Sequence, residues 1–256
     1  MPSKFNSPKI NTYNNRLFDK KGLRSWVHNS RFHWFRRTLE CLKIKNTRVI
    51  EIGCFDGRLL AYLPESPARY EGFDAGWEGG LSEAQVKYAG SETLHFHKSD
   101  NPSDLSIFEP GTFDIGVAME TIEHIPPHLV DGYLEQLARV VDGYLLITVP
   151  NEKGIIFLLK WLAKKVILSG SMEKYTLSEL IAATFGKLDK VERNEHKGFD
   201  YDVLVNQIGR HFDLKKIEGT FASWLPVRLA VTVAIIAKSK DMENQALPLP
   251  SKHPTK

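Results

Sequence analysis

Two carboxylates and an imidazole lie within five residues of one another, directly after an apolar run. Glu120, Glu123 and His124 are spaced i, i+3 and i+4, so one helical turn would place them on one face. A second imidazole, His196, stands far along the chain in a polar and aromatic cluster. Such groups act as general bases, and mixed sets of them bind Mg²⁺ or Mn²⁺. We expect His124 or His196 to be a base and Glu120 to be catalytic. All four are candidate metal ligands, unless Glu123 and His124 only cap or pair within a loop.

A glycine-bounded turn follows the first apolar run of the chain. The turn passes from Glu51 through Gly53 to Gly57, and a helical pattern begins near Arg58. Glycine lets a backbone approach a ligand closely. Asp74 ends the second apolar run, at the place where doubly wound folds hold ribose hydroxyls. The pattern predicts a nucleoside site, with a plain strand-to-helix turn as the alternative.

Short apolar runs rich in β-branched residues predict the strands that position these side chains. Five of them cover 48–52, 70–73, 93–97, 113–119 and 144–149. The segments between them are long enough for helices, for instance 58–63 and 128–141, so the sheet should be mostly parallel. Two more runs, 212–218 and 231–237, are joined without a helical pattern and predict an antiparallel pair.

The expected fold is therefore α/β: a doubly wound, mostly parallel seven-stranded sheet with an antiparallel C-terminal hairpin and a helical cap insertion. We expect a single domain over 21–239, with the cap at about 152–210 forming the acceptor pocket. The tails at 1–20 and 240–256 are polar or proline-containing and are expected to be disordered.

The 51–57 segment, Glu-Ile-Gly-Cys-Phe-Asp-Gly, resembles motif I of class I, Rossmann-like S-adenosylmethionine-dependent methyltransferases. The family pattern is Glu or Asp, x, Gly, x, Gly, x, Gly, and Phe55 replaces its middle glycine. The resemblance implies that Asp74 binds the ribose and that Asp100 lies by the adenine. The full set of cofactor residues that it implies is Glu51, Gly53, Cys54, Phe55, Gly57, Asp74, Asp100 and Met119. A dinucleotide dehydrogenase would need Gly-x-Gly-x-x-Gly, which the chain lacks.

The Glu120–His124 segment and His196 resemble the Glu-x-x-Glu-His and later His of Hen1-type small-RNA 2′-O-methyltransferases, which hold a divalent metal. Quinone O-methyltransferases contain a segment that resembles this one as closely. The resemblance implies S-adenosylmethionine as cofactor, with Mg²⁺ or Mn²⁺ as a second candidate. We expect methylation of an oxygen on a small-molecule, saccharide or lipid-linked acceptor. The alternatives are a metal-dependent RNA 2′-O-methyltransferase and a non-catalytic module that keeps the fold to bind a partner.

The charge balance argues against a general nucleic-acid binder. The chain has 34 basic and 31 acidic residues, so its net charge is only +3. The segment Arg31–Arg37 interleaves basic residues with aromatic residues, as proteins that bind single-stranded nucleic acid do. However, Trp34 and Phe35 continue into Leu39 as a buried helical stripe, which is the interpretation we prefer. We expect no nucleic-acid partner.

The segment 155–168 predicts a helix with a wide apolar arc and three lysines, Lys160, Lys164 and Lys165. Such a helix can lie in a membrane interface with its lysines on anionic headgroups, or it can pack as a lid or a dimer contact. The apolar stretch is too short to span a bilayer, and two cysteines are too few for a disulfide framework. We expect a cytoplasmic protein, peripheral to the inner face of a membrane if this helix meets lipid. The oligomeric state is left open.

Overall fold

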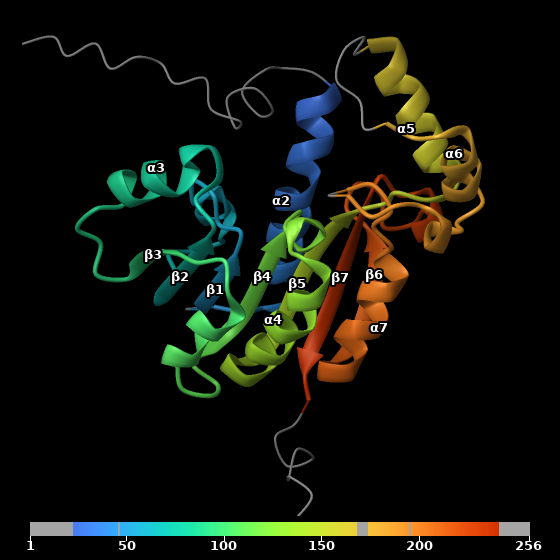
Figure 1. Cartoon of the computed structure of the whole chain (residues 1–256). Helices are drawn as coiled ribbons and strands as arrows, with labels where there is room; N and C mark the ends of the chain where they lie inside the picture. The colour runs from blue at the N-terminus through green and yellow to red at the C-terminus, as the bar shows by residue number, and fades with distance from the viewer. Residues whose placement is uncertain (1–22, 46, 168–173, 195, 241–256) are drawn as a thin grey trace, which may run out of the picture.

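The computed structural model describes residues 23–45, 47–167, 174–194 and 196–240, and these form a seven-stranded sheet between layers of helices (Figure 1). The strand order is β3-β2-β1-β4-β5-β7-β6. The strands are β1 (Arg48–Ile52), β2 (Arg69–Asp74), β3 (Leu94–Lys98), β4 (Phe113–Met119), β5 (Val141–Pro150), β6 (Phe212–Gly219) and β7 (Thr232–Ser239). The first five run parallel, and β7 pairs antiparallel with both β5 and β6. The predicted fold class is confirmed.

Helices cover both faces of this sheet. The α-helices are α2 (Leu23–Leu42), α3 (Gly80–Lys87), α4 (Pro127–Val140), α5 (Gly154–Ile167), α6 (Leu177–Thr184) and α7 (Tyr201–His211). Short 3₁₀ helices connect them: η1 (Arg58–Tyr62), η2 (Trp77–Gly79), η3 (Pro102–Ile107), η4 (Ile122–His124), η5 (Leu188–Lys190) and η6 (Val227–Leu229). No helix in the described ranges has the length and apolar character needed to cross a membrane.

The strands have continuous apolar runs because both faces of the sheet are buried. On β4, Val117 packs in one core cluster with Phe35 and Leu39 of α2. The next residue, Ala118, packs in the other cluster with Leu134 and Leu137 of α4. Successive side chains of a strand point to opposite faces, so each strand supplies both cores.

The predicted helix at 58–63 is only the short 3₁₀ helix η1. Gly57 precedes it in the left-handed conformation and offers no side-chain cap. Leu63 ends it in an extended conformation because Pro64 follows, and a residue before proline is driven out of the helical region. The chain therefore turns back to the sheet after about one and a half turns of helix.

The predicted cap is shorter than 152–210. Its last part forms α7, which packs against α4. Tyr201, Leu204 and Ile208 of α7 lie in the same core cluster as α4, on one face of the sheet. The remaining cap consists of α5, α6 and η5 around a small core of its own, made by Phe157, Ala182, Ala183, Leu188 and Val191. The predicted disordered tails, 1–20 and 241–256, lie outside the described residues. Lys240, also assigned to a tail, is described, and its Nζ donates hydrogen bonds to the carbonyls of Gly209 and Arg210.

Candidate functional site

The predicted site residues lie at one edge of the sheet, where the five parallel strands end (Figure 1). The strand order reverses between β1 and β4, so the loops after these two strands diverge and leave room between them. The loop after β1 carries Gly53 and Gly57, and the loop after β4 carries Glu120, Glu123 and His124. This switch point is the usual ligand site of a doubly wound sheet.

Gly53 begins the loop after β1 and has no room for a side chain. Its φ is +76°, and a Cβ there would lie 2.1 Å from Oγ1 of Thr121, which follows β4. The amides of Gly53 and Cys54 both donate hydrogen bonds to the carbonyl of Phe73, over 2.7 and 3.1 Å. The loop is thus tied to the ends of β2 and β4, and Gly53 is required by packing as well as by conformation.

Asp74 ends β2 and turns its carboxylate toward this loop. Oδ2 accepts a hydrogen bond from the amide of Phe55 at 3.0 Å, and Oδ1 accepts one from the amide of Gly76 at 2.7 Å. Each carboxylate oxygen can accept a second bond, so two acceptor positions remain for a ligand. The role of Asp74 at the ribose stays a prediction, but its position and orientation suit that role.

Phe55, at the middle-glycine position, adopts a left-handed conformation with φ of +46°. A side chain in this conformation costs about 1 to 2 kcal/mol relative to glycine. Its ring lies against Gly80 at the start of α3, where a Cβ would come within 2.6 Å of the ring atoms. Trp77, a half-exposed side chain, has its ring centroid 6.4 Å from that of Phe55. The substitution of the middle glycine is therefore accommodated by a glycine 25 positions later.

Glu51 is buried inside the core, although the resemblance assigned it to the cofactor. Its carboxylate accepts a hydrogen bond from the hydroxyl of Tyr70, and only 3% of the residue is exposed. Burial raises the pKa of Glu51 to about 8, while the Tyr70 bond opposes that shift. Cys54 is also buried, and burial raises the pKa of its thiol. Contact of either side chain with the cofactor stays a prediction.

The other two assigned cofactor residues differ in exposure. Met119, the last residue of β4, is buried, and its Sδ accepts a hydrogen bond from Oγ1 of Thr148 at 3.4 Å. Asp100 lies just beyond β3 with an exposed side chain, so it is free to reach a ligand at the same edge. Neither assignment is tested by these contacts.

The single helical turn predicted for 120–124 is wrong in its first residues. Glu120 has a φ of +54°, and its amide donates a hydrogen bond to the carbonyl of Thr148 on β5. The helical turn, η4, begins only at Ile122. Glu120 consequently points toward α2, where its Oε2 lies 4.0 Å from Nη1 of Arg31. A non-glycine residue held in this conformation is frequent at functional sites.

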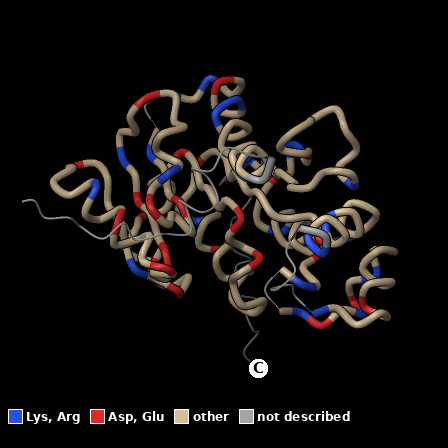
Figure 2. Tube along the Cα trace, turned by 90° about the horizontal axis from the view of Figure 1, so that it is seen from above, with Lys and Arg blue, Asp and Glu red and all other residues tan. Residues whose placement is uncertain are grey.

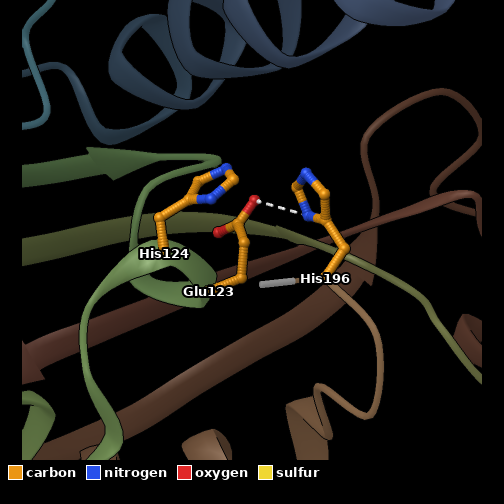
Figure 3. Close-up of side chains that lie close together, drawn as sticks. All are labelled: Glu123, His124 and His196. Carbon is orange, nitrogen blue, oxygen red and sulfur yellow. Dashed lines mark ion pairs between the residues drawn. The ribbon is translucent and has the colours of Figure 1, made fainter. Parts of the chain in front are cut away.

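Glu123, His124 and His196 come together at the end of β4 (Figure 3). One ligand atom from each lies within 4.8 Å of the others, and Glu120 is not part of this group among the described residues. Oε1 of Glu123 is 3.7 Å from Nδ1 of His196, and the two imidazole centroids are 4.5 Å apart. Figure 3 shows the three side chains pointing toward one another. His196 thus lies beside Glu123 and His124 although it is 72 positions after His124 in the sequence, whereas Glu120, which was predicted with them, lies outside the group. Their roles as base or metal ligands stay predictions.

The electrostatics of this cluster are those of an uncompensated site. Glu123 is 1% exposed, and neither of its carboxylate oxygens has a hydrogen-bond partner among the described residues. Burial, followed by the charge of Glu120, raises its pKa well above the usual value. Burial, with His124 as the next cause, lowers the pKa of His196 to about 3, so this imidazole is neutral. Buried polar groups are nearly always paired, so a ligand, proton or cation is expected here.

Two arginines and a lysine that sequence reasoning did not assign to the site help to build it. Arg193 donates a hydrogen bond from Nη2 to the carbonyl of Glu123 at 2.6 Å, which fixes the His196 segment to the end of β4. Lys197 forms a buried ion pair with Glu179 of α6 at 2.8 Å, which fixes the same segment to the cap. Arg31 reaches the site from α2, which precedes the sheet. Only tertiary contacts reveal these residues, because no local pattern marks them.

The basic and aromatic segment Arg31–Arg37 forms part of α2, as the buried-stripe interpretation predicted. Trp34 and Phe35 are at most 2% exposed, and Trp34 Nε1 donates a hydrogen bond to Glu218 on β6. Arg37 donates to the carbonyl of Thr220. Figure 2, which looks down on the site edge, shows Lys and Arg interspersed with Asp and Glu around the described chain. The expectation of no nucleic-acid partner stays a prediction.

The predicted helix 155–168 is found as α5, with Leu168 outside the described residues. Phe157 and Trp161 pack against α6, as a lid would, whereas Ile155, Leu159 and Leu162 are 44 to 54% exposed. Lys160 turns inward and binds Glu152 and the carbonyl of Asn151. The lysines left exposed are Lys164 and Lys165. The helix thus combines a packed face with an exposed apolar face.

A comparison with protein families assigns most of the chain to one family. A family model described as a methyltransferase domain matches residues 23–221. The ubiquinone biosynthesis O-methyltransferase of Leptothrix cholodnii is 24% identical over 144 residues, which are 56% of this chain and 60% of that protein. The match therefore spans less than two thirds of that relative's length.

Two solved structures show the same fold. An S-adenosylmethionine-dependent methyltransferase from Clostridium acetobutylicum has a TM-score of 0.59 at 11% identity, covering 88% of this chain and 95% of that one. The methyltransferase domain of bacterial CtHen1 has a TM-score of 0.53 at 14% identity, covering 83% and 99%. At these identities the likeness is one of fold.

Proposed function

The chain belongs to the methyltransferase domain family, and we propose that it methylates an oxygen atom of a small-molecule acceptor, either a saccharide or a lipid-linked compound. It is an S-adenosylmethionine-dependent methyltransferase by family and fold. The distant ubiquinone biosynthesis relative supports an oxygen acceptor. The observation that carries the choice of oxygen is the cluster of Glu123 with two imidazoles at the switch point.

The residues at the β1 and β2 ends fit the nucleoside of the methyl donor. Asp74 is held by two backbone amides and keeps two acceptor positions for ribose hydroxyls. Gly53 and Gly57 allow the backbone to approach the ligand, and the buried Met119 ends the neighbouring strand β4. S-adenosylmethionine supplies an electrophilic methyl group that is bonded to a sulfonium sulfur. After the transfer, the demethylated cofactor is released as S-adenosylhomocysteine.

The remaining task of the protein is to align the acceptor and remove its proton. Alignment of two bound reactants contributes about 7 to 11 kcal/mol to such displacements. Bound S-adenosylmethionine would supply its methyl group to the acceptor oxygen, and its sulfur would keep the electron pair of the broken bond. The hydroxyl proton passes to the imidazole of His124 or to that of His196, whose ring centroid lies 4.5 Å away. Arg31 and Arg193 hold the two loops that carry these groups.

The cluster also fits a divalent cation. Glu123 has two buried oxygens and His196 has a buried Nδ1 with no hydrogen-bond partner among the described residues. A cation would remove the cost of burying these groups unpaired. Glu123, His124 and His196 would hold it, and such an ion lowers the pKa of a bound hydroxyl. Glu120 would lie outside that set, because its carboxylate faces Arg31 rather than the cluster.

RNA 2′-O-methylation is the second candidate, because the Glu-x-x-Glu-His segment and the later His do meet in space. Two observations weigh against it. The charges of both signs are interspersed (Figure 2), whereas nucleic-acid binders concentrate positive charge. The basic and aromatic stretch of α2 has its aromatic side chains buried in the core. A small-molecule acceptor therefore remains our proposal.

The test uses the purified protein, methyl-labelled S-adenosylmethionine and a panel of hydroxyl acceptors: catechol, a phenol, a free saccharide and a short RNA. We expect labelled methyl ethers of a small molecule, identified by mass spectrometry. Glu123→Gln should reduce the rate at least tenfold, while Glu135→Gln on the outer part of α4 should match the wild type. Label in the RNA alone would favour the second candidate. An EDTA effect reversed by Mn²⁺ would support the cation, and an unchanged rate in EDTA would argue against it.

A further inference from the structure

A cavity of about 130 Å³ lies between α2 and the loop that joins β6 to β7. Its walls include Trp26, Val27 and Ser30 from α2, and Phe221, Leu225 and Leu229 from the loop. The rings of Trp26 and Phe221 meet edge to face at its rim with centroids 4.0 Å apart, and both side chains are about half exposed. No residue of the cap helices α5 and α6 lines it, so it is separate from the acceptor pocket expected in the cap.

Several polar atoms of its walls already have hydrogen-bond partners within the protein. Ser30 Oγ donates to the carbonyl of Val27 at 2.7 Å and lies 2.9 Å from Oγ1 of Thr220. The carbonyl of Ala230 accepts a hydrogen bond from Asn151 at 2.9 Å. A water molecule needs two to four polar partners in a buried site, and these walls offer few. The chemistry of the cavity therefore favours an apolar occupant.

The cavity lies at the same edge of the sheet as the Glu123 and His196 cluster, although no residue lines both. Ser30 is adjacent in α2 to Arg31, whose guanidinium lies 4.0 Å from the Glu120 carboxylate at the end of β4. On the other wall, the carbonyl of Val231 accepts a hydrogen bond from the amide of Asn151, directly after β5. Glu120 in turn donates to Thr148 of the same strand. A molecule that fills the cavity therefore lies at the same edge of the sheet as the Glu123 and His196 cluster, separated from it by Arg31 and the end of β5.

We propose that this cavity binds the apolar chain or ring of the methyl acceptor, holding about five or six carbon atoms. This inference rests on the proposed function and adds the substrate's second recognition element. An apolar cavity of about 150 Å³ binds benzene, so the volume here suits a ring of that size or a short branched chain. The exposed aromatic rim at Trp26 and Phe221 would receive the part of a longer chain that projects from the cavity.

The first experiment measures binding directly, without turnover. Methyl groups of Val27, Leu225 and Leu229 are followed by NMR while 1-butanol and then 1-pentanol are titrated. Their resonances should shift, and the longer alcohol should bind about fourfold more tightly, because each buried methylene contributes about 0.8 kcal/mol. Val27→Phe fills the cavity and should abolish the shifts. Val203→Phe, the same change at an exposed valine of α7, should bind like the wild type.

The second experiment links the cavity to the acceptor. Catechol and 4-butylcatechol are compared as acceptors in the wild type and in Val27→Phe. The variant should lower kcat/KM at least tenfold for the butyl compound and leave it within twofold for catechol, with unchanged affinity for S-adenosylhomocysteine. Equal losses for both acceptors would overturn the inference, as would an absence of 1-pentanol binding at these methyl groups.

The two failures can be told apart. If 1-pentanol does not bind but hydroxyl acceptors are methylated, the cavity assignment alone is wrong. If 1-pentanol binds but no hydroxyl acceptor is methylated, the proposed function is wrong and the assignment to an acceptor falls with it. A Val27→Phe variant with a smaller solution mass than the wild type would show that a second copy of the chain fills the cavity instead, which also overturns the inference.

Discussion

Replacement of Asp74 by alanine tests the placement of the methyl donor. The carboxylate is fixed by the amides of Phe55 and Gly76 and retains one free acceptor position on each oxygen. Hydrogen bonds to a charged group contribute about 1.5 to 3 kcal/mol each. Loss of two of them to ribose hydroxyls should cost at least about 3 kcal/mol, which corresponds to about a 150-fold weaker affinity.

Isothermal titration with S-adenosylhomocysteine measures this loss without need of an acceptor. Asp74→Asn keeps one oxygen acceptor and should lose only part of the affinity. Asp213→Ala, which removes an exposed carboxylate from β6, serves as the matched control and should bind like the wild type. Thermal unfolding establishes that each variant is folded. If Asp74→Ala binds S-adenosylhomocysteine within threefold of the wild type, the ribose does not lie at Asp74.

Four further changes test other parts of the structure. His196→Ala should lower kcat at least 100-fold with unchanged S-adenosylhomocysteine affinity, since a general base contributes 10² to 10⁴-fold; an active variant would remove His196 from the mechanism. Gly80→Ala should lower the free energy of unfolding by about 1 to 3 kcal/mol, because its Cβ meets the Phe55 ring, and Phe55→Gly should recover most of that loss in the double variant. Additive effects in denaturant unfolding would contradict this contact. Burial raises the pKa of Glu51 to about 8, so the folded state holds this proton more tightly than the unfolded state, and stability should fall as pH rises from about 4.5 to 8. Glu51→Gln should remove this dependence and stabilise the protein by up to about 3 kcal/mol at pH 7 in urea unfolding, whereas parallel pH profiles would refute the shift. The exposed face of α5, with Ile155, Leu159 and Leu162, should bind vesicles that contain phosphatidylglycerol, and Leu159→Ser should weaken co-sedimentation at least threefold; equal binding by wild type and variant would leave α5 as a lid only.

The strands were predictable because their burial is a property of the sequence itself. Strands covered on both faces need nearly uninterrupted apolar residues. Residues 113–119 form such a run in the sequence, and in the structure they are the strand β4, which contributes to both core clusters. The loop of Gly53 and the acid at Asp74 were likewise predictable, because they adjoin strand ends. The meeting of Glu123 with His196 followed from a resemblance, since no local pattern joins residues so far apart.

Other features depend on contacts that no local pattern contains. The spacing of Glu120 and Glu123 suggested one helical turn, but the amide of Glu120 bonds to Thr148 on the neighbouring strand and delays the turn. The last part of the cap proved to be α7, whose helical pattern does not reveal that it packs beneath the sheet. Arg193 belongs to the site only through a tertiary contact, the hydrogen bond that its guanidinium donates to the carbonyl of Glu123.

The central claim is methyl transfer to an oxygen of a small acceptor at the Glu123 and His196 cluster. The most direct measurement incubates the protein and methyl-labelled S-adenosylmethionine with a lysate of its source cells, then compares label in the organic phase, the aqueous small-molecule fraction and the RNA. His196→Ala provides the matched background. We predict label in one of the two small-molecule fractions, dependent on His196, with the organic phase indicating a lipid-linked acceptor. Label confined to RNA, or equal label from His196→Ala, would contradict the account.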